Sequence, residues 1–201
     1  MSTQDPADKR SALSDTKRAL LERRLRGDVA SAPPRATIGR MAGPGPEHPA
    51  SFAQERMWFL TRLDPDKPLY NVPVAMLVPA DVDVPLLERA LTTVVSRHEA
   101  LRTGFRMGED GQLRQIVHEP FPMTVEVREA RHRIGERFAD SVNDLVAEEG
   151  SHPFDLSRPP LMRVTLLRVS DGDYAMVTTT HHIVTDGWAY PLMNREILEC
   201  Y

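Results

Sequence analysis

Cysteine is almost absent from this chain of 201 residues, and several features that would narrow its class are missing as well. Cys200 is the one cysteine, so no disulfide can form within the chain and nothing supports an oxidising compartment. No apolar run approaches the roughly 20 residues that span a bilayer. The polar segment 1–10 lacks the apolar stretch of a signal peptide. We therefore expect a cytoplasmic protein that contacts no membrane.

An excess of positive charge is also missing. The chain has 25 lysines and arginines against 29 aspartates and glutamates, a net charge of −4. This balance argues against a protein dedicated to nucleic-acid binding. The histidines outside the two segments described below, 97–105 and 180–188, are scattered without the spacing of metal ligands, so we expect no metal. These are His48, His118, His132 and His152.

The chain divides by composition into three parts. Residues 28–50 hold five prolines and three glycines, which predicts a linker without packed elements. Before it, the segment Ser14–Arg26 has leucines at helical spacing and five basic residues. It is either a solvated helix or a docking element for an acidic partner. We thus expect a helical or docking segment at 1–27, a linker at 28–50 and a globular part at 51–201.

The globular part mixes helical and extended patterns, which indicates an α/β or α+β sandwich. Ser51 is suited to cap a helix whose apolar positions include Phe52, Trp58 and Phe59, three residues expected in the core. Pro73 predicts an edge or a bulge for its strand. Strands are expected at 70–78, 101–106, 112–117, 123–127, 161–169 and 174–180, and helices from Ser51, from Pro85, at 134–149 and from Trp188 or Tyr190.

The segment 180–188 carries the clearest chemical signal, since His181 and His182 stand where a strand ends. Neighbouring side chains of a strand point to opposite faces, so one histidine is expected inside the protein and one at a cavity. A histidine with a pKa near 6.5 can accept or relay a proton at neutral pH. Asp186 can fix the following turn, and Gly187 allows a ligand close to the backbone. Alternatively, both histidines are buried and structural.

Three motifs in order resemble those of condensation domains from nonribosomal peptide synthetases, over about residues 51–201. Residues 51–60 resemble S-x-A-Q-x-R-[LM]-W-x-L, residues 97–105 resemble R-H-E-x-L-R-T-x-F, and residues 181–187 resemble H-H-x-x-x-D-G. Arg56, Arg97 and Arg102 are expected to be structural in the first two motifs. We interpret Arg97 to Arg102 as an internal salt-bridge network, with substrate contact as the alternative.

The resemblance implies one lobe of the fold of chloramphenicol acetyltransferase, a mixed sheet covered by helices. It implies amide formation between two thioesters carried on phosphopantetheine arms, with no cofactor bound directly. His182 would accept a proton from the attacking amine or position it. His181 would be structural, Asp186 would hold the loop through an arginine pair, and Gly187 would leave room for the pantetheine arm.

The implied partners are an upstream donor carrier protein, a downstream peptidyl carrier protein, and the C-terminal lobe and adenylation domain of the same polypeptide. The motifs of that second lobe are absent, so we expect the isolated lobe to be inactive. Whether the donor comes from a peptide or a polyketide module stays open. The alternatives are a free-standing acyltransferase of the same superfamily and a non-catalytic docking fragment.

Overall fold

The computed structural model describes residues 15, 45, 47–79, 81–129, 138–168 and 174–201. The chain forms two units, residues 1–44 and 45–201, and the helices and strands below belong to the second. The expected helix at 14–26, most of the expected linker and the turn at 170–173 lie outside the described residues.

A four-stranded mixed sheet forms the centre of this second unit, in the order β2-β7-β6-β5. Its strands are β2 (Asn71–Val78), β5 (Glu126–Glu129), β6 (Met162–Arg168) and β7 (Tyr174–His181). The pairs β2–β7 and β6–β7 are antiparallel, whereas β5 runs parallel to β6. The edge position predicted for β2 from Pro73 is confirmed, because proline lacks the N–H that an inner strand must donate.

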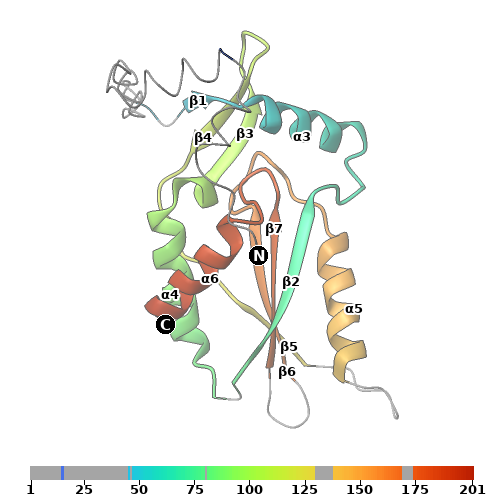
Figure 1. Cartoon of the computed structure of the whole chain (residues 1–201), viewed down its shortest axis with the longest axis vertical. Coiled ribbons are helices and arrows are strands. Elements are labelled where there is room, and N and C mark those ends of the chain that lie inside the picture. The colour runs from blue at the N-terminus through green and yellow to red at the C-terminus, as the bar shows by residue number, and fades with distance from the viewer. Residues whose placement is uncertain (1–14, 16–44, 46, 80, 130–137, 169–173) are drawn as a thin grey trace. The chain divides into compact units, whose positions relative to one another are not determined.

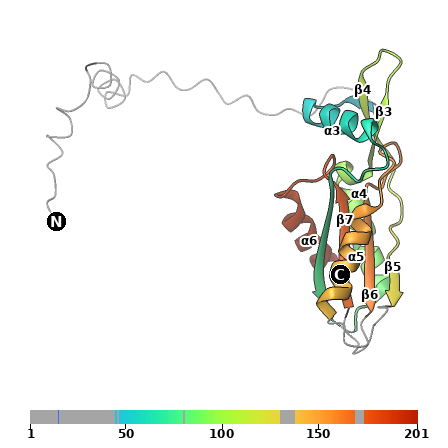
Figure 2. The same ribbon diagram turned by 90° about the vertical axis from the view of Figure 1, so that its right-hand side faces the viewer.

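Helices cover both faces of this sheet (Figure 1; Figure 2 views it from the α5 side). On one face lie α4 (Val84–Arg97) and α6 (Ala189–Cys200), and on the other lies α5, described over Phe138–Ser151. Strand alternation assigns each inward residue to one of two cores. The larger core joins α4 and α6 to the sheet through Leu91, Val94, Val95, Met162, Val164, Leu166, Met176, Met193 and Ile197; the smaller joins α5 through Leu145, Leu167, Ala175 and Val177.

A second sheet of three strands has the order β1-β4-β3. It contains β1 (Glu47–Pro49) and the predicted hairpin of β3 (Thr103–Met107) and β4 (Leu113–Val117). The linker prediction was wrong for 47–49, which pair antiparallel with β4. The short edge strand tolerates Pro49, and the hydrogen bond from Ala50 N to the Leu113 carbonyl, 3.0 Å, continues the pairing.

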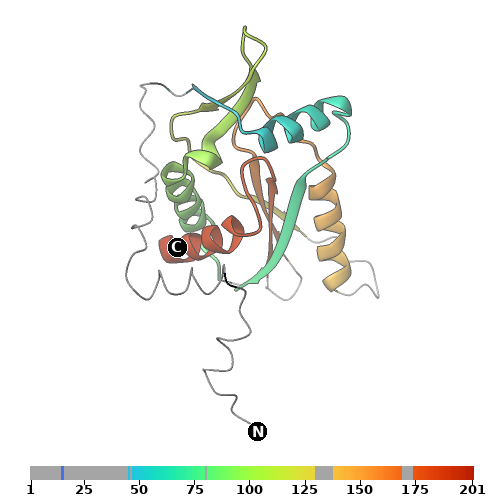
Figure 3. The ribbon, with the colours of Figure 1, turned by 45° about the horizontal axis from the view of Figure 1, so that its top comes forward.

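Helix α3 (Phe52–Leu63) lies beside the β3–β4 hairpin (Figure 3). Ser51 caps it as predicted, in a capping box with Gln54. Trp58 packs on the core that contains Phe105 and Leu156. The prediction of a core position was wrong for Phe52 and Phe59, which are 91% and 57% exposed, because α3 turns its opposite side to that core. None of the helices described is long and apolar enough to cross a membrane.

Candidate active site

The end of β7 separates the two histidines of the motif at residues 181–187, which we call the signature. His181 is 1% exposed, and desolvation lowers the pKa of its ring to about 4, so the ring is neutral at pH 7. The Ile183 N–H donates to His181 Nδ1 at 3.1 Å, which leaves the proton of the neutral ring on Nε2. Nε2 has no hydrogen-bond partner among the described residues. The Leu69 backbone raises the pKa of the His181 ring, but the lowering by desolvation is larger.

His182 is exposed and lies just beyond the end of β7, whose residues 175–181 are all buried. Its backbone N–H donates to the Tyr70 carbonyl at 2.8 Å. No hydrogen bond to its ring occurs within the described residues, and the ring is exposed to solvent. Gly187 is also exposed, and a Cβ added there would meet nothing within 4 Å. The open space at Gly187 fits the close approach of a ligand to this loop.

The loop between β7 and α6 is fixed mainly by its own atoms. The Thr185 hydroxyl lies 2.8 Å from Thr180 Oγ1, and the Val184 N–H donates to the His181 carbonyl at 3.1 Å. Asp186 Oδ1 accepts from the backbone N–H groups of Trp188 and Ala189, 3.0 and 2.7 Å, at the start of α6. In the part of the chain that the structure describes, no arginine pairs with Asp186, so here the carboxylate holds the loop through these two backbone hydrogen bonds.

Two aromatic rings that the sequence analysis did not single out contact the His181 ring. The Tyr70 ring lies 6.2 Å away at 61° and the Phe154 ring 6.2 Å away at 90°, both edge to face. The Arg163 guanidinium stacks over Phe154 at 3.9 Å. These residues come from three segments that are distant in the sequence. Tyr70 directly precedes β2, Phe154 lies in the loop after α5, and Arg163 lies in β6.

Arg163 is itself fixed by a network beneath α5. Its Nη2 donates to the carbonyls of Glu149 and His152, 3.0 and 2.8 Å, and its Nε lies 3.4 Å from Glu149 Oε2. The buried Glu149 carboxylate also lies 3.1 Å from Arg128 Nη2 and accepts from Thr165 Oγ1 at 3.1 Å. A buried carboxylate with these partners fixes the position of both arginines.

The charged segment 97–102 forms ion pairs, as our salt-bridge interpretation expected, but it divides into two groups. Arg97 Nη1 and His98 Nε2 lie 2.7 and 2.9 Å from Glu196 Oε2 and so join α4 to α6. Arg102 pairs with Glu99 at 3.5 Å and donates to the His118 carbonyl. The Glu196 pairs therefore tie α6, the helix that follows the loop of residues 182–188, to the end of α4. Glu196 was missed because it lies almost 100 residues away in the sequence.

Arg56 is exposed on α3, and no ion pair or hydrogen bond of its side chain is found within the described residues. The expected structural role of Arg56 therefore has no contact to support it here.

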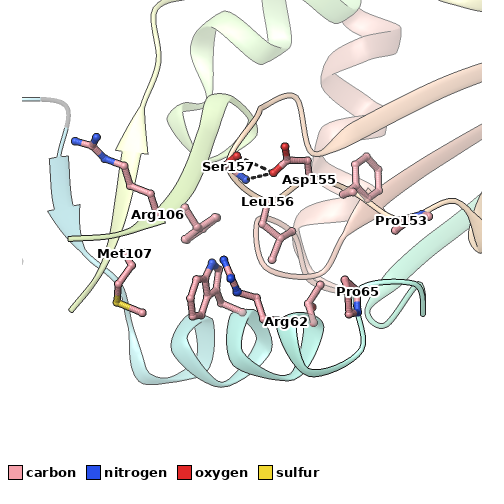
Figure 4. A pocket seen from close by; sticks show the side chains of 12 residues that line it. Arg62, Pro65, Arg106, Met107, Pro153, Asp155, Leu156 and Ser157 are labelled. Atoms are coloured by element: carbon pink, nitrogen blue, oxygen red, sulfur yellow. Dashed lines mark hydrogen bonds between the residues drawn. The ribbon is translucent and has the colours of Figure 1, made fainter. Parts of the chain in front are cut away.

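A cavity of about 650 Å³ lies between α3, β3 and the loop 153–157 (Figure 4). Its lining includes Arg62, Arg106 and Asp155, and Asp155 Oδ1 accepts from the Ser157 N–H and hydroxyl at 3.0 and 2.7 Å. Phe154 lines the same cavity and contacts the His181 ring. No group of His, Cys, Asp or Glu able to hold a metal occurs among the residues that the structure describes.

Comparison with known sequences points to peptide synthetases. The chain is 37% identical over 155 residues to bacitracin synthase 1 of Bacillus licheniformis, covering 77% of the chain and 3% of that protein. It is 38% identical over 187 residues to phosphinothricin tripeptide synthetase PhsC of Streptomyces viridochromogenes, covering 93% of the chain and 17% of that protein. The chain therefore spans a small part of these relatives.

Comparison with solved structures gives the same assignment. The starter condensation domain of rhizomide synthetase RzmA superposes with a TM-score of 0.66 and 25% identity, over 77% of this chain and 38% of that one. The first condensation domain of the CDA synthetase gives a TM-score of 0.67 at 23% identity, over 77% and 39%. The predicted fold class is confirmed by these structures. The sequence model of the family described as Condensation domain matches residues 46–201, and the chain belongs to that family.

Proposed function

We propose that this chain is the histidine-bearing lobe of a condensation domain that forms amide bonds between two carrier-bound thioesters in a peptide synthetase, in the cytoplasm. The observation that carries the proposal is the separation of the signature histidines. His181 is buried and neutral, whereas His182 and Gly187, which follow it in the same segment, are exposed. An exposed histidine held at the end of a rigid strand is suited to accept or relay a proton.

In this reaction the amine of the acceptor aminoacyl thioester attacks the carbonyl carbon of the donor thioester. The C–N bond forms, the C–S bond breaks, and the donor arm leaves as a thiol. His182 accepts a proton from the attacking nitrogen or orients its lone pair. Holding both tethered reactants in one channel supplies a large part of the rate gain. The phosphopantetheine arms belong to the carriers, so the lobe needs no cofactor of its own.

The exposed side of α3 supports a carrier protein as a partner. Phe52, Phe59 and Leu63 are exposed there, in a row that includes Arg56. We call these four residues the α3 stripe. A contiguous apolar surface with a cation favours a protein partner that carries apolar and acidic groups. The donor carrier, the acceptor carrier, the C-terminal lobe and the adenylation domain are the partners that this function requires.

The proposal is tested with the complete condensation domain, a donor carrier loaded with an acyl group and an acceptor carrier loaded with an amino acid. The intact mass of the acceptor is followed. We expect the parent to add the acyl mass and His182→Ala to lose at least about 100-fold in rate, the scale of general acid–base catalysis. His118→Ala is the matched control, since His118 is an exposed histidine outside the signature.

Two outcomes would replace the proposal. A parent domain that yields no product with any loaded carrier pair, yet binds carriers, would be a docking module. A parent that moves its acyl group to a free alcohol or amine, and not to a carrier-bound one, would be a free-standing acyltransferase. Equal rates for His182→Ala and the parent would remove the role assigned to His182.

A further inference from the structure

Tyr70 has an unusual backbone conformation next to the signature. Its φ is 67°, and among the residues that the structure describes it is the only non-glycine residue with a positive φ. A bulky side chain is crowded by its own backbone in this left-handed region. Such a conformation persists where the surroundings hold it, and it is frequent at functional sites.

In this conformation the Tyr70 carbonyl faces the His182 backbone. It accepts a hydrogen bond from the His182 N–H at 2.8 Å, one residue beyond the last paired residues of β2 and β7, Asn71 and His181. The bond therefore fixes the backbone of His182 where the strand pairing ends. Because no hydrogen bond to the His182 ring occurs within the described residues, the backbone is what directs this side chain.

The Tyr70 side chain acts on the other histidine. Its ring contacts the His181 ring edge to face at 6.2 Å, and Phe154 makes a second such contact at 6.2 Å. Arg163 stacks on Phe154 and is tethered to the carbonyls of Glu149 and His152. The His181 ring is thus flanked by two aromatic rings, one of them stacked against a tethered arginine, and it is 1% exposed, so the ring is shielded from water.

We propose that Tyr70 is a positioning residue for His182, acting through its carbonyl on the His182 backbone and through its ring on His181. Tyr70 thereby acts on both histidines. Its left-handed backbone places the carbonyl at the His182 N–H, and its aromatic side chain contacts the His181 ring. The effect on catalysis rests on the proposed function, whereas the effect on the His182 backbone does not.

Three variants separate the two contributions. Tyr70→Phe keeps the ring and loses the hydroxyl. Tyr70→Gly loses the ring but adopts a positive φ without steric cost. Tyr70→Ala loses the ring and disfavours that φ. Elsewhere in a chain glycine destabilises relative to alanine, so a glycine variant that outperforms the alanine variant identifies the backbone effect.

The first readout is amide hydrogen exchange of His182 in this chain, with the thermal midpoint of each variant measured so that all are compared while folded. We expect Tyr70→Ala to exchange the His182 amide at least about 10-fold faster than the parent, Tyr70→Gly to lie between the two, and Tyr70→Phe to match the parent. The His181 ring nitrogens, followed by ¹⁵N resonance, should shift in Ala and Gly alike, because both lose the ring contact.

The second readout is the condensation rate of the complete domain. We expect Tyr70→Ala to lower kcat by about 10- to 100-fold with the KM for loaded acceptor carrier within about 2-fold, since misplacement of a reacting group lowers the rate at the chemical step. Tyr70→Gly should recover part of the loss, and Tyr70→Phe should lie within about 2-fold of the parent. A purely structural role would lower the thermal midpoint without this order of kcat values.

Equal amide exchange in the parent, Gly and Ala proteins would overturn the inference, as would a Phe variant as slow as the Ala variant. His182→Ala is measured in parallel to keep the two proposals apart. If His182→Ala retains full activity, the catalytic proposal fails, while the amide exchange still decides whether Tyr70 positions His182. If His182→Ala is inactive and Tyr70→Ala is as fast as the parent, the positioning role fails alone.

Discussion

Helices α3 and α4 have the same kind of apolar periodicity and opposite surroundings. In α4, Leu91 and Val95 are fully buried against the sheet and α6. In α3, Phe59 and Leu63 stand one turn apart at the same spacing and are more than half exposed. Periodicity therefore predicts that a helix face is an interface, and it does not tell whether the partner is this chain's own core or another surface.

The signature repeats this contrast between two adjacent identical residues. His181 is enclosed by rings and its ring is neutral, whereas the His182 ring faces solvent. Here the end of the strand decides the difference, because helices cover both faces of β7 up to His181, whereas His182 lies just beyond the strand. The buried member of each pair should govern stability and the exposed member should govern function, and the following predictions test that division.

Leu91→Ala should have the largest effect on stability. The side chain is 0% exposed and packs in the larger core, so its truncation leaves a cavity that the surrounding side chains fill only in part. We expect a loss of about 2–5 kcal/mol in the free energy of unfolding. Urea unfolding followed by circular dichroism measures it. A loss below about 1 kcal/mol would mean that α4 contributes no more to the fold than α3 does.

Acid should destabilise the protein through His181. Unfolded, this histidine binds a proton below a pKa of about 6.5, whereas burial lowers the folded pKa to about 4. The unfolded state therefore binds more protons between these values, and stability falls as the pH is lowered from 6.5 to 4. At about 1.4 kcal/mol per pKa unit, the loss attributable to His181 approaches about 3 kcal/mol at pH 4.

The His181 contribution is isolated by comparing variants across that range, because carboxylates titrate there as well. His181→Gln should remove most of the difference in stability between pH 6.5 and pH 4.5. His182→Gln is the matched control and should keep it, since the His182 ring is exposed in the folded protein. If stability depends on pH in the same way in both variants, burial of His181 is not the cause of the loss of stability in acid.

Much of the fold follows from sequence because its signals are local. The Ser51 cap, Pro85 at the start of α4, the hairpin around residues 108–111 and the edge position of β2 each depend on a few neighbouring residues. The prediction for residues 47–49 failed because their partner, β4, lies more than 60 residues away. Composition alone does not reveal a short edge strand that a distant hairpin requires.

The site divides in the same way. The place of His181 and His182 at the end of a strand, and the turn that follows with Asp186 and Gly187, are indicated by residues adjacent in the chain. The aromatic contacts of His181 do not, since Tyr70, Phe154 and Arg163 come from three separate segments. The arginine pair expected for Asp186 is not formed within the described residues, and hydrogen bonds from the backbone N–H groups of Trp188 and Ala189 take its place there.

Phe59→Ala should have the smallest effect on stability and a clear effect on binding. The side chain is 57% exposed and belongs to none of the buried cores described, so we expect a change within about 0.5 kcal/mol in the free energy of unfolding. The same change should weaken binding of a loaded carrier to the complete domain by about 10-fold, because apolar residues at the centre of an interface contribute most of its affinity.

The matched control for Phe59→Ala is Leu77→Ala, which truncates a side chain that is 70% exposed on the edge strand β2, away from α3. Carrier affinity, measured by titration calorimetry, should fall for Phe59→Ala and not for Leu77→Ala. Equal affinities in both would show that the α3 stripe contacts something other than a carrier. A loss above about 2 kcal/mol in the free energy of unfolding of Phe59→Ala would instead show that Phe59 stabilises the fold as a core residue such as Leu91 does. The contrast between α3 and α4 would then be wrong.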